Sequence, residues 1–302
     1  MSTYNHILFN DVADFFASKL PSAIEKIDCE IYANADVEVY IKRDDLIDSV
    51  ISGNKWRKLK YTLLDCIQNG KNHILTFGGA YSNHLPAVAK VCNSWGLKST
   101  AFVRGEELSA NSNIHLQYCN SQVMELIFIE RILYKNKKTL VSQYYKDESN
   151  IYIVDEGGRG FLGAKGCGDI INELECTFDH IFVCVGTGTT LAGIANAAAI
   201  KFAKTIINGI VVLKGAEEIE NEVKEMTTQN NWVLHHQFHG GGYGKTYPEL
   251  DSFIEHYKKK TNIPCELVYT GKMFYAIDQL IKVGYIKKGQ KVLAIHTGGF
   301  EI

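Results

Sequence analysis

The sequence predicts an α/β fold with doubly wound, mostly parallel sheets. Short apolar segments alternate along the chain with longer segments whose apolar residues recur at helical spacing. Some of the short segments, such as residues 180–185, are hydrophobic throughout, which is typical of parallel strands covered by helices on both faces. Glycine turns follow several of them, and in such sheets ligands bind at the carboxyl ends of the strands.

The predicted elements follow one another in the order that this fold requires. Strands are expected at residues 37–42, 73–77, 99–103, 123–127, 151–154, 180–185, 206–213 and 292–296. Helices are expected at residues 55–67, 83–95, 190–203, 248–260 and 272–283. Strand 37–42 alternates apolar and polar residues, strand 73–77 ends at a Gly-Gly pair, and helix 248–260 begins at a proline, which is favoured in the first turn.

The composition excludes several classes of partner. With 46% hydrophobic and 22% charged residues, the chain of 302 residues is typical of globular proteins. The 32 basic residues nearly balance the 34 acidic ones, which argues against binding to nucleic acid or anionic lipid. Neither a membrane span of ~20 apolar residues nor a signal peptide at Met1–Asn10 is expected. Scattered cysteines without a C-x-x-C pair favour a reduced, cytoplasmic protein.

The first glycine turn, Ser52-Gly53-Asn54-Lys55, opens a predicted helix. At a helix N-terminus, desolvation and the positive end of the helix dipole lower the pKa of a lysine, and such a lysine can form a Schiff base. Lys58 follows one turn later and is expected to face the same side. The alternative is a simple helix start with a solvated lysine.

The second turn, residues 78–84, joins a predicted strand to a predicted helix. The N–H groups at a helix N-terminus bind carboxylate or phosphate, and glycines let the backbone approach a ligand closely. The alternative is that Ser82 or Asn83 only caps the helix.

The third turn, residues 186–190, has the sequence Gly-Thr-Gly-Thr-Thr between an apolar strand and a helix. Its hydroxyls and glycines suit a phosphate monoester better than a pyrophosphate. It lacks the Lys-Ser/Thr pair of a Walker A loop, and no acidic residue follows at the ~20-residue distance typical of nicotinamide dinucleotide sites. A lysine for an aldehyde, a phosphate turn and a carboxylate turn together indicate pyridoxal 5'-phosphate with an amino-acid substrate.

With these motifs, the chain resembles the 1-aminocyclopropane-1-carboxylate deaminase/D-cysteine desulfhydrase family of fold type II pyridoxal-phosphate enzymes. The resemblance rests on KRDDL at 42–46, SGNKWRKLKY at 52–61, FGGAYSNH at 77–84, EGG at 156–158, VGTGTTLAG at 185–193, GGYGK at 241–245, YTGK at 269–272 and HTGG at 296–299. It implies a tryptophan synthase β-like fold of two open twisted sheets, with the cofactor in the cleft between domains. The implied domains are a small one at 56–155 and a large one comprising 1–55 and 156–302, and the implied assembly is a homodimer.

The resemblance also implies which residues bind the cofactor. Lys55 is the implied Schiff-base lysine, Lys58 a phosphate partner, and Asn83 the partner of the phenolic oxygen. The phosphate turn would consist of Gly186, Thr187, Gly188, Thr189 and Thr190. Tyr269 would stack on the pyridine ring.

Further residues are implied to act on the substrate. Ser82 and the backbone at 83–84 would hold the substrate carboxylate, so that the substrate-binding set is Tyr81, Ser82, Asn83 and His84. Lys55, Ser82, Tyr269 and the second tyrosine, Tyr243, would form the catalytic set. No metal is expected, because His235, His236 and His239 lie on a predicted strand and a glycine loop rather than on a helix.

Thr270 and Thr297 distinguish the two branches of the family. In the deaminase branch these positions hold Glu and Leu, and a carboxylate beside the pyridine nitrogen keeps it protonated and makes a strong electron sink. A threonine hydroxyl is expected to donate to a neutral nitrogen, which leaves a weaker sink. Expulsion of a thiolate needs less electron withdrawal than opening of a cyclopropane ring, so the resemblance favours a D-cysteine desulfhydrase.

The expected reaction begins when a D-amino acid displaces Lys55 from the cofactor, after which Lys55 removes the α-proton. Loss of the β-substituent and hydrolysis then yield pyruvate and ammonia. The alternatives are a 1-aminocyclopropane-1-carboxylate deaminase, a lyase for another D-amino acid, a pyridoxal-phosphate binding protein without turnover and, more distantly, a nicotinamide-dependent dehydrogenase.

Overall fold

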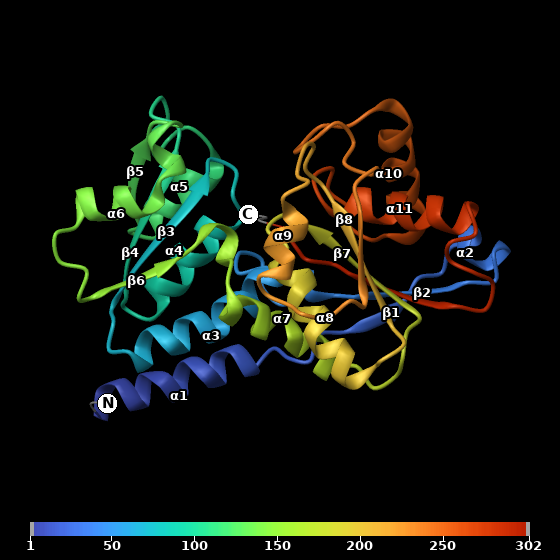
Figure 1. Cartoon of the computed structure of the whole chain (residues 1–302), viewed down its shortest axis with the longest axis horizontal. Coiled ribbons are helices and arrows are strands. Elements are labelled where there is room, and N and C mark those ends of the chain that lie inside the picture. The colour runs from blue at the N-terminus through green and yellow to red at the C-terminus, as the bar shows by residue number, and fades with distance from the viewer. Residues whose placement is uncertain (1–2, 300–302) are drawn as a thin grey trace. The chain divides into compact units, whose positions relative to one another are not determined.

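Two mostly parallel sheets organise residues 3–299, which are the residues that this computed structural model describes. One sheet has the strand order β5-β4-β3-β6 and the other the order β1-β2-β10-β7-β8-β9. Each sheet belongs to a separate unit of the chain (Figure 1). The four-stranded unit comprises the described residues up to Leu20, Ile47–Gly163 and Gly299, and the six-stranded unit comprises Pro21–Leu46 and Ala164–Gly298.

All neighbouring strands of the four-stranded unit run parallel. Its strands are β3 (His73–Gly79), β4 (Lys98–Arg104), β5 (Glu125–Ile129) and β6 (Ile151–Val154). Its helices are α1 (Thr3–Ala17), α3 (Asn54–Gln68), α4 (His84–Ser94), α5 (Ile114–Ser121) and α6 (Lys137–Tyr144), with 3₁₀ turns at Leu133–Lys135 and Glu156–Gly158. Both faces of the sheet are covered, because Ile74 belongs to one apolar core and the next residue, Leu75, to another.

The N-terminal helix α1 packs alongside α3, as Figure 1 shows. Trp56 of α3 is fully buried against the rings of Phe15 and Phe16, and its indole Nε1 donates to the carbonyl oxygen of Phe16 over 3.1 Å. The four-stranded unit includes α1, residues 47–55 and residues 156–163, whereas the sequence-based division placed residues 1–55 and 156–302 in the other unit.

The six-stranded unit has one antiparallel pair, β1 with β2, and its remaining paired strands are parallel. Its strands are β1 (Ile24–Lys26), β2 (Glu38–Lys42), β7 (His180–Val185), β8 (Ile206–Val211), β9 (Trp232–His235) and β10 (Lys291–Ile295). Its helices are α2 (Glu30–Asn34), α7 (Phe161–Asn172, which begins at the unit boundary), α8 (Thr189–Lys201), α9 (Ile219–Lys224), α10 (Pro248–Thr261) and α11 (Thr270–Lys282). A 3₁₀ turn covers Asp44–Leu46.

The predicted α/β class with mostly parallel sheets is confirmed. Strand β5 begins at Glu125 rather than at Val123, because Val123 has a φ of +62° and forms the turn after α5. The sequence did not predict α1, α5, α6, α7 or α9. No helix among the described residues has the length and apolar character to cross a membrane.

Candidate functional site

Lys55 and Lys58 lie together at the start of α3, as their spacing predicts. Their ammonium groups donate to the same acceptor, the carbonyl oxygen of Gly157, over 3.4 Å and 3.1 Å. Lys58 is buried and Lys55 is half-buried. Gly157 belongs to the EGG segment at 156–158, for which no role was predicted. The structure thus places two cationic groups at one point of the four-stranded unit.

His84 lies beside this lysine pair as a buried, neutral imidazole. Thr76 donates its hydroxyl proton to the carbonyl oxygen of Val154, so that Nε2 of His84 donates to Thr76 Oγ1 over 2.8 Å. His84 Nδ1 is then an acceptor, with no hydrogen-bond partner among the described residues. Burial, followed by the charges of Lys55 and Lys58, holds the pKa of His84 well below its ordinary value.

The other residues of the second glycine turn lie just before α4. Ser82 Oγ accepts from the backbone N–H of His84 over 3.3 Å, so it acts as a local cap. Asn83 Oδ1 lies 3.1 Å from Nε2 of His115, a residue of α5 that the sequence did not single out. The ring of Tyr81 is 62% exposed and meets His115 edge-on. Because His115 engages the amide oxygen of Asn83, the amide N–H groups are directed elsewhere and suit a phenolic acceptor.

The third turn lies between β7 and α8, at the carboxyl end of the sheet in the six-stranded unit. Gly188 precedes α8 in the left-handed conformation (φ +70°), and the hydroxyls of Thr187 and Thr189 lie 3.1 Å apart. Thr189 and Thr190 are buried in the first turn of the helix. Gly188 has no side chain to cap α8, and the first N–H groups of a helix lack partners within it. N–H groups and hydroxyls at a helix start are the kinds of donor that bind an anion.

Tyr243 and Tyr269 form a pair in the six-stranded unit. Their rings meet edge to face with centroids 6.0 Å apart, and their hydroxyls are hydrogen-bonded. Burial is the main cause that raises the pKa of both hydroxyls. Tyr243 belongs to a loop in which Gly240, Gly241, Gly242 and Gly244 all have positive φ. Such a loop loses much conformational freedom on folding and needs a contact that holds it.

Lys272 supplies that contact from α11. Its side chain is fully buried, and Nζ donates to the carbonyl oxygen of Gly242 over 2.8 Å. Replacing Lys272 by Met keeps most of the apolar stem but removes this hydrogen bond. We expect amide hydrogen exchange at residues 240–245 to accelerate about tenfold, as hydrogen–deuterium exchange mass spectrometry would show. The exposed Lys259, replaced by Met, is the control, and equal exchange in both variants would contradict a clamping role.

Thr270 and Thr297 lie at the ends of two elements of the same unit. Thr270 is fully buried at the start of α11, and its hydroxyl donates to Oε1 of Glu266 over 3.2 Å. Thr297 follows β10 and is buried. Its neighbour His296 is fixed by the carbonyl oxygen of Pro264 and the N–H of Gly298. The hydroxyl proton of Thr270 is therefore already engaged, which differs from the expectation that it is available to a ring nitrogen.

The predicted site residues thus form two groups, one in each unit. The four-stranded unit brings together Lys55, Lys58, Tyr81, Ser82, Asn83 and His84, and the six-stranded unit holds Gly186, Thr187, Gly188, Thr189, Thr190, Tyr243, Tyr269, Thr270 and Thr297. Sequence analysis missed Gly157, His115, Glu266 and Lys272. Gly157 and Lys272 had a signal, because they belong to the EGG and YTGK segments.

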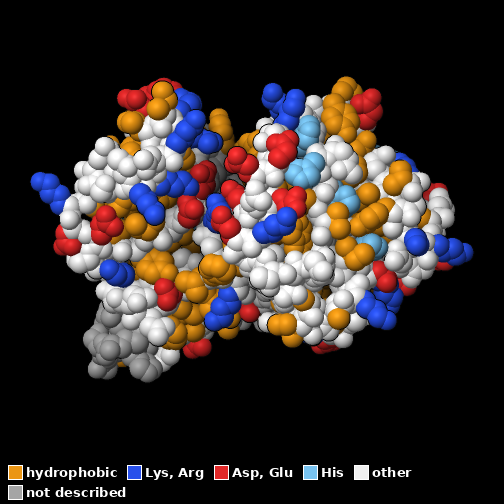
Figure 2. Space-filling model, in the orientation of Figure 1, with side chains coloured by type: hydrophobic (Ala, Val, Ile, Leu, Met, Phe, Trp, Pro, Cys, Tyr) orange, Lys and Arg blue, Asp and Glu red, His pale blue; other side chains and the backbone are white. Residues whose placement is uncertain are grey.

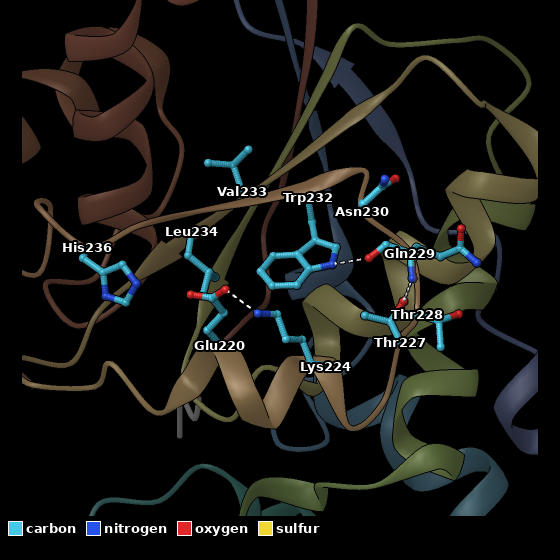
Figure 3. A pocket seen from close by; sticks show the side chains of 10 residues that line it. All are labelled: Glu220, Lys224, Thr227, Thr228, Gln229, Asn230, Trp232, Val233, Leu234 and His236. Atoms are coloured by element: carbon cyan, nitrogen blue, oxygen red, sulfur yellow. Dashed lines mark hydrogen bonds and ion pairs between the residues drawn. The ribbon is translucent and has the colours of Figure 1, made fainter.

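A separate pocket of about 670 Å³ lies between α9 and the edge strand β9 (Figure 3). The ion pair of Glu220 and Lys224 borders it, and the indole N–H of Trp232 donates to the carbonyl oxygen of Gln229. None of the predicted site residues lines this pocket.

Histidine side chains gather on one face of the six-stranded unit, around the region where Figure 1 labels β8 (Figure 2). Nε2 of buried His235 is hydrogen-bonded to Oδ1 of Asn208, and Nδ1 of His239 accepts from the N–H of Gly241. Within residues 3–299, no group of three His, Cys, Asp or Glu side chains is placed to hold a metal ion.

A family model described as pyridoxal-phosphate dependent enzyme matches residues 27–298. The chain belongs to this family. Among curated relatives, a putative 1-aminocyclopropane-1-carboxylate deaminase of Pyrococcus horikoshii is 32% identical, over 87% of this chain and 84% of that protein. A D-cysteine desulfhydrase of Yersinia enterocolitica is 26% identical, over 87% of this chain and 86% of that protein.

Solved structures agree with this assignment. A crystal structure described as an ACC deaminase homologue has a TM-score of 0.79 and 27% identity, and the match covers 95% of this chain and 94% of that one. O-ureido-L-serine synthase shares the fold, with a TM-score of 0.69 at 12% identity, over 95% of this chain and 91% of that one. The predicted cofactor, pyridoxal phosphate, and the predicted fold type are thereby confirmed.

The residues present fit pyridoxal phosphate chemically. A Cβ added at Gly186 would meet no described atom within 4 Å, so there is open space beside this glycine in the turn at 186–190. A phosphate monoester needs several N–H and O–H donors, and the turn with the first residues of α8 offers both kinds. The four-stranded unit offers lysine amines for the aldehyde. Each unit of this pyridoxal-phosphate dependent enzyme therefore holds groups of a kind that the cofactor requires.

Proposed function

We propose that the protein is a lyase for a small D-amino acid, with D-cysteine as its main substrate. The reaction converts D-cysteine and one water molecule into pyruvate, ammonia and hydrogen sulfide. The Cα–H, Cβ–S and Cα–N bonds break, and water supplies the oxygen of the keto group. Pyridoxal phosphate, when bound, withdraws electrons from the α-carbon and so makes the α-proton removable.

In this proposal, each of the two residue groups has its own roles in binding the cofactor and the substrate. Lys55 binds the cofactor aldehyde and afterwards accepts the α-proton at Nζ. Ser82 and the N–H groups at the start of α4 hold the substrate carboxylate, and Asn83, oriented by His115, donates to the phenolic oxygen. The turn at 186–190 binds the phosphate, with Lys58 as a further cation. Tyr269 lies against the ring, and its hydrogen-bonded partner Tyr243 faces the substrate.

The observation that favours elimination over ring opening is that buried hydroxyls occupy positions 270 and 297. A carboxylate at position 270 would hold a proton on the ring nitrogen directly, whereas a hydroxyl is uncharged and stabilises that proton less. Elimination needs a weaker electron sink because a thiolate is a good leaving group. The second candidate, deamination of 1-aminocyclopropane-1-carboxylate, is favoured by the printed names of several relatives.

Product analysis tests the proposal. Purified, cofactor-loaded protein is given D-cysteine, L-cysteine or 1-aminocyclopropane-1-carboxylate, and pyruvate, 2-oxobutyrate and sulfide are measured. We expect pyruvate and sulfide in equal amounts from D-cysteine alone. 2-Oxobutyrate from the cyclopropane substrate at a higher kcat/KM would favour the second candidate, and pyruvate from L-cysteine would reverse the proposed stereochemistry.

A homodimer, which the resemblance implies, and a cytoplasmic location, which the scattered cysteines favour, stay predictions. Light scattering coupled to gel filtration measures the first, and fractionation of cells measures the second.

A further inference from the structure

Glu266 binds the N-terminus of α11 with both carboxylate oxygens. Oε1 accepts from the backbone N–H groups of Tyr269 and Thr270 over 2.9 Å and 2.7 Å. Oε2 accepts from Val268 over 2.6 Å and from Tyr269 over 3.0 Å. The negative charge is fixed at the positive end of a helix dipole, four residues before Thr270.

The hydroxyl of Thr270 both accepts a hydrogen bond from Glu266 and donates one to it. The N–H of Glu266 donates to Thr270 Oγ1 over 3.1 Å, and Oγ1 donates its proton to Oε1 of Glu266 over 3.2 Å. A hydroxyl has one proton and two lone pairs. The hydroxyl proton is donated in a hydrogen bond to Glu266, and one lone pair accepts from the backbone N–H. Thr270 therefore has a single lone pair left for a ligand.

The hydrogen bond from the Thr270 hydroxyl to Glu266 is stronger than one to a neutral ring nitrogen would be. A hydrogen bond to an ionised carboxylate is roughly twice as strong as one to a neutral acceptor such as an unprotonated pyridine nitrogen. Thr270 is also fully buried, where the difference between charged and neutral partners increases. A neutral ring nitrogen could accept from the Thr270 hydroxyl only if the hydrogen bond to Glu266 were broken. A protonated ring nitrogen instead donates to the remaining lone pair, and the bond to Glu266 is kept.

We propose that Glu266 is a positioning residue that makes the Thr270 hydroxyl an acceptor, so that the cofactor is held with its ring nitrogen protonated. The inference rests on the proposed function, which places Thr270 at that nitrogen. The carboxylate then acts through one intervening hydroxyl, which gives an electron sink weaker than a direct carboxylate but stronger than a hydroxyl alone.

The charge of Glu266 also reaches the tyrosine pair. Burial is the largest cause that raises the pKa of Tyr269 and Tyr243. The charge of Glu266 is a smaller cause that raises both. Its field therefore acts on the ring that is proposed to lie against the cofactor.

The test uses ¹⁵N NMR of protein loaded with pyridoxal phosphate labelled at the ring nitrogen, without substrate. We expect a pyridinium-type resonance in the wild-type protein and an unprotonated-type resonance in Glu266→Gln, which retains an acceptor oxygen but no charge. Thr270→Ser should keep the wild-type resonance and Thr270→Val should lose it. Glu249→Gln, in the exposed first turn of α10, is the control for an acidic helix start.

Two results would overturn the inference: an unprotonated nitrogen in the wild type, or a protonated one in Glu266→Gln. Because the resonance is recorded without substrate, it is independent of which amino acid the protein converts. If D-cysteine is a substrate, kcat/KM of Glu266→Gln should fall about tenfold, the effect of one hydrogen bond to a charged group. Wild-type resonances without D-cysteine turnover would reject the proposed function and retain the role of Glu266.

Discussion

Replacing Lys55 by alanine should lower kcat/KM for D-cysteine by at least about a thousandfold, which corresponds to about 4 kcal/mol of transition-state stabilisation. The amine is the group proposed both to bind the cofactor aldehyde and to accept the α-proton, so one substitution removes two functions. Folding should be unaffected, because Lys55 is half-buried and lies outside the apolar core. Steady-state kinetics and the thermal unfolding midpoint are measured on the same preparation.

Lys60 is the matched control for that experiment. It lies on the same helix, half-buried, with its ammonium 4.8 Å from the ring of Tyr61. Lys60→Ala should retain turnover within a factor of about two, because Lys60 is not one of the predicted site residues and its cation–π contact with Tyr61 affects helix stability rather than chemistry. Comparable kinetics in Lys55→Ala and Lys60→Ala would reject Lys55 as the reactive lysine and direct attention to Lys58.

The sequence predicted the fold best where local pattern and tertiary packing agree. Strands β6 and β7 have the predicted bounds, since each is a short apolar run ended by polar or glycine residues. Helix α7 was missed because its sequence, FLGAKGCGDIIN, contains three glycines and has low helix propensity. One of these glycines has a tertiary reason: a Cβ on Gly168 would lie 3.2 Å from the carbonyl oxygen of Gly193 in α8. Single-sequence reasoning does not reveal such a contact.

The site was predictable only as far as neighbours along the chain determine it. Lys55 and Lys58 share an acceptor because residues three apart face the same side of a helix. The acceptor itself, Gly157, is about a hundred residues away, and its position depends on the parallel pairing of β3 with β6. The hydrogen bond between Asn83 and His115 likewise joins residues that are distant in the sequence, and it depends on the packing of α4 against α5. The bond from Thr270 to Glu266 is local, but its direction follows only from the geometry of the helix start.

Replacing Gly193 by alanine should destabilise the six-stranded unit by about 3–5 kcal/mol. A Cβ at this position would collide with the carbonyl oxygen of Ala164 and lie 2.9 Å from the Cβ of Cys167. The collision is with backbone atoms of α7, so no rotamer change relieves it and the two helices must separate. Separation would open the core that Ile194 and Ile170 help to form. Chemical denaturation followed by circular dichroism measures the loss.

Gly186 provides the contrast that separates cofactor binding from folding. An alanine there meets no described atom within 4 Å, and the backbone at this glycine is not left-handed, so the free energy of unfolding should change by less than about 1 kcal/mol. The added methyl group would instead occupy the opening of the phosphate turn, and the Kd for pyridoxal phosphate should rise at least about tenfold. Equal stability of Gly193→Ala and Gly186→Ala would contradict the close packing of α7 on α8. An unchanged Kd in Gly186→Ala would mean that the phosphate does not bind at residues 186–190.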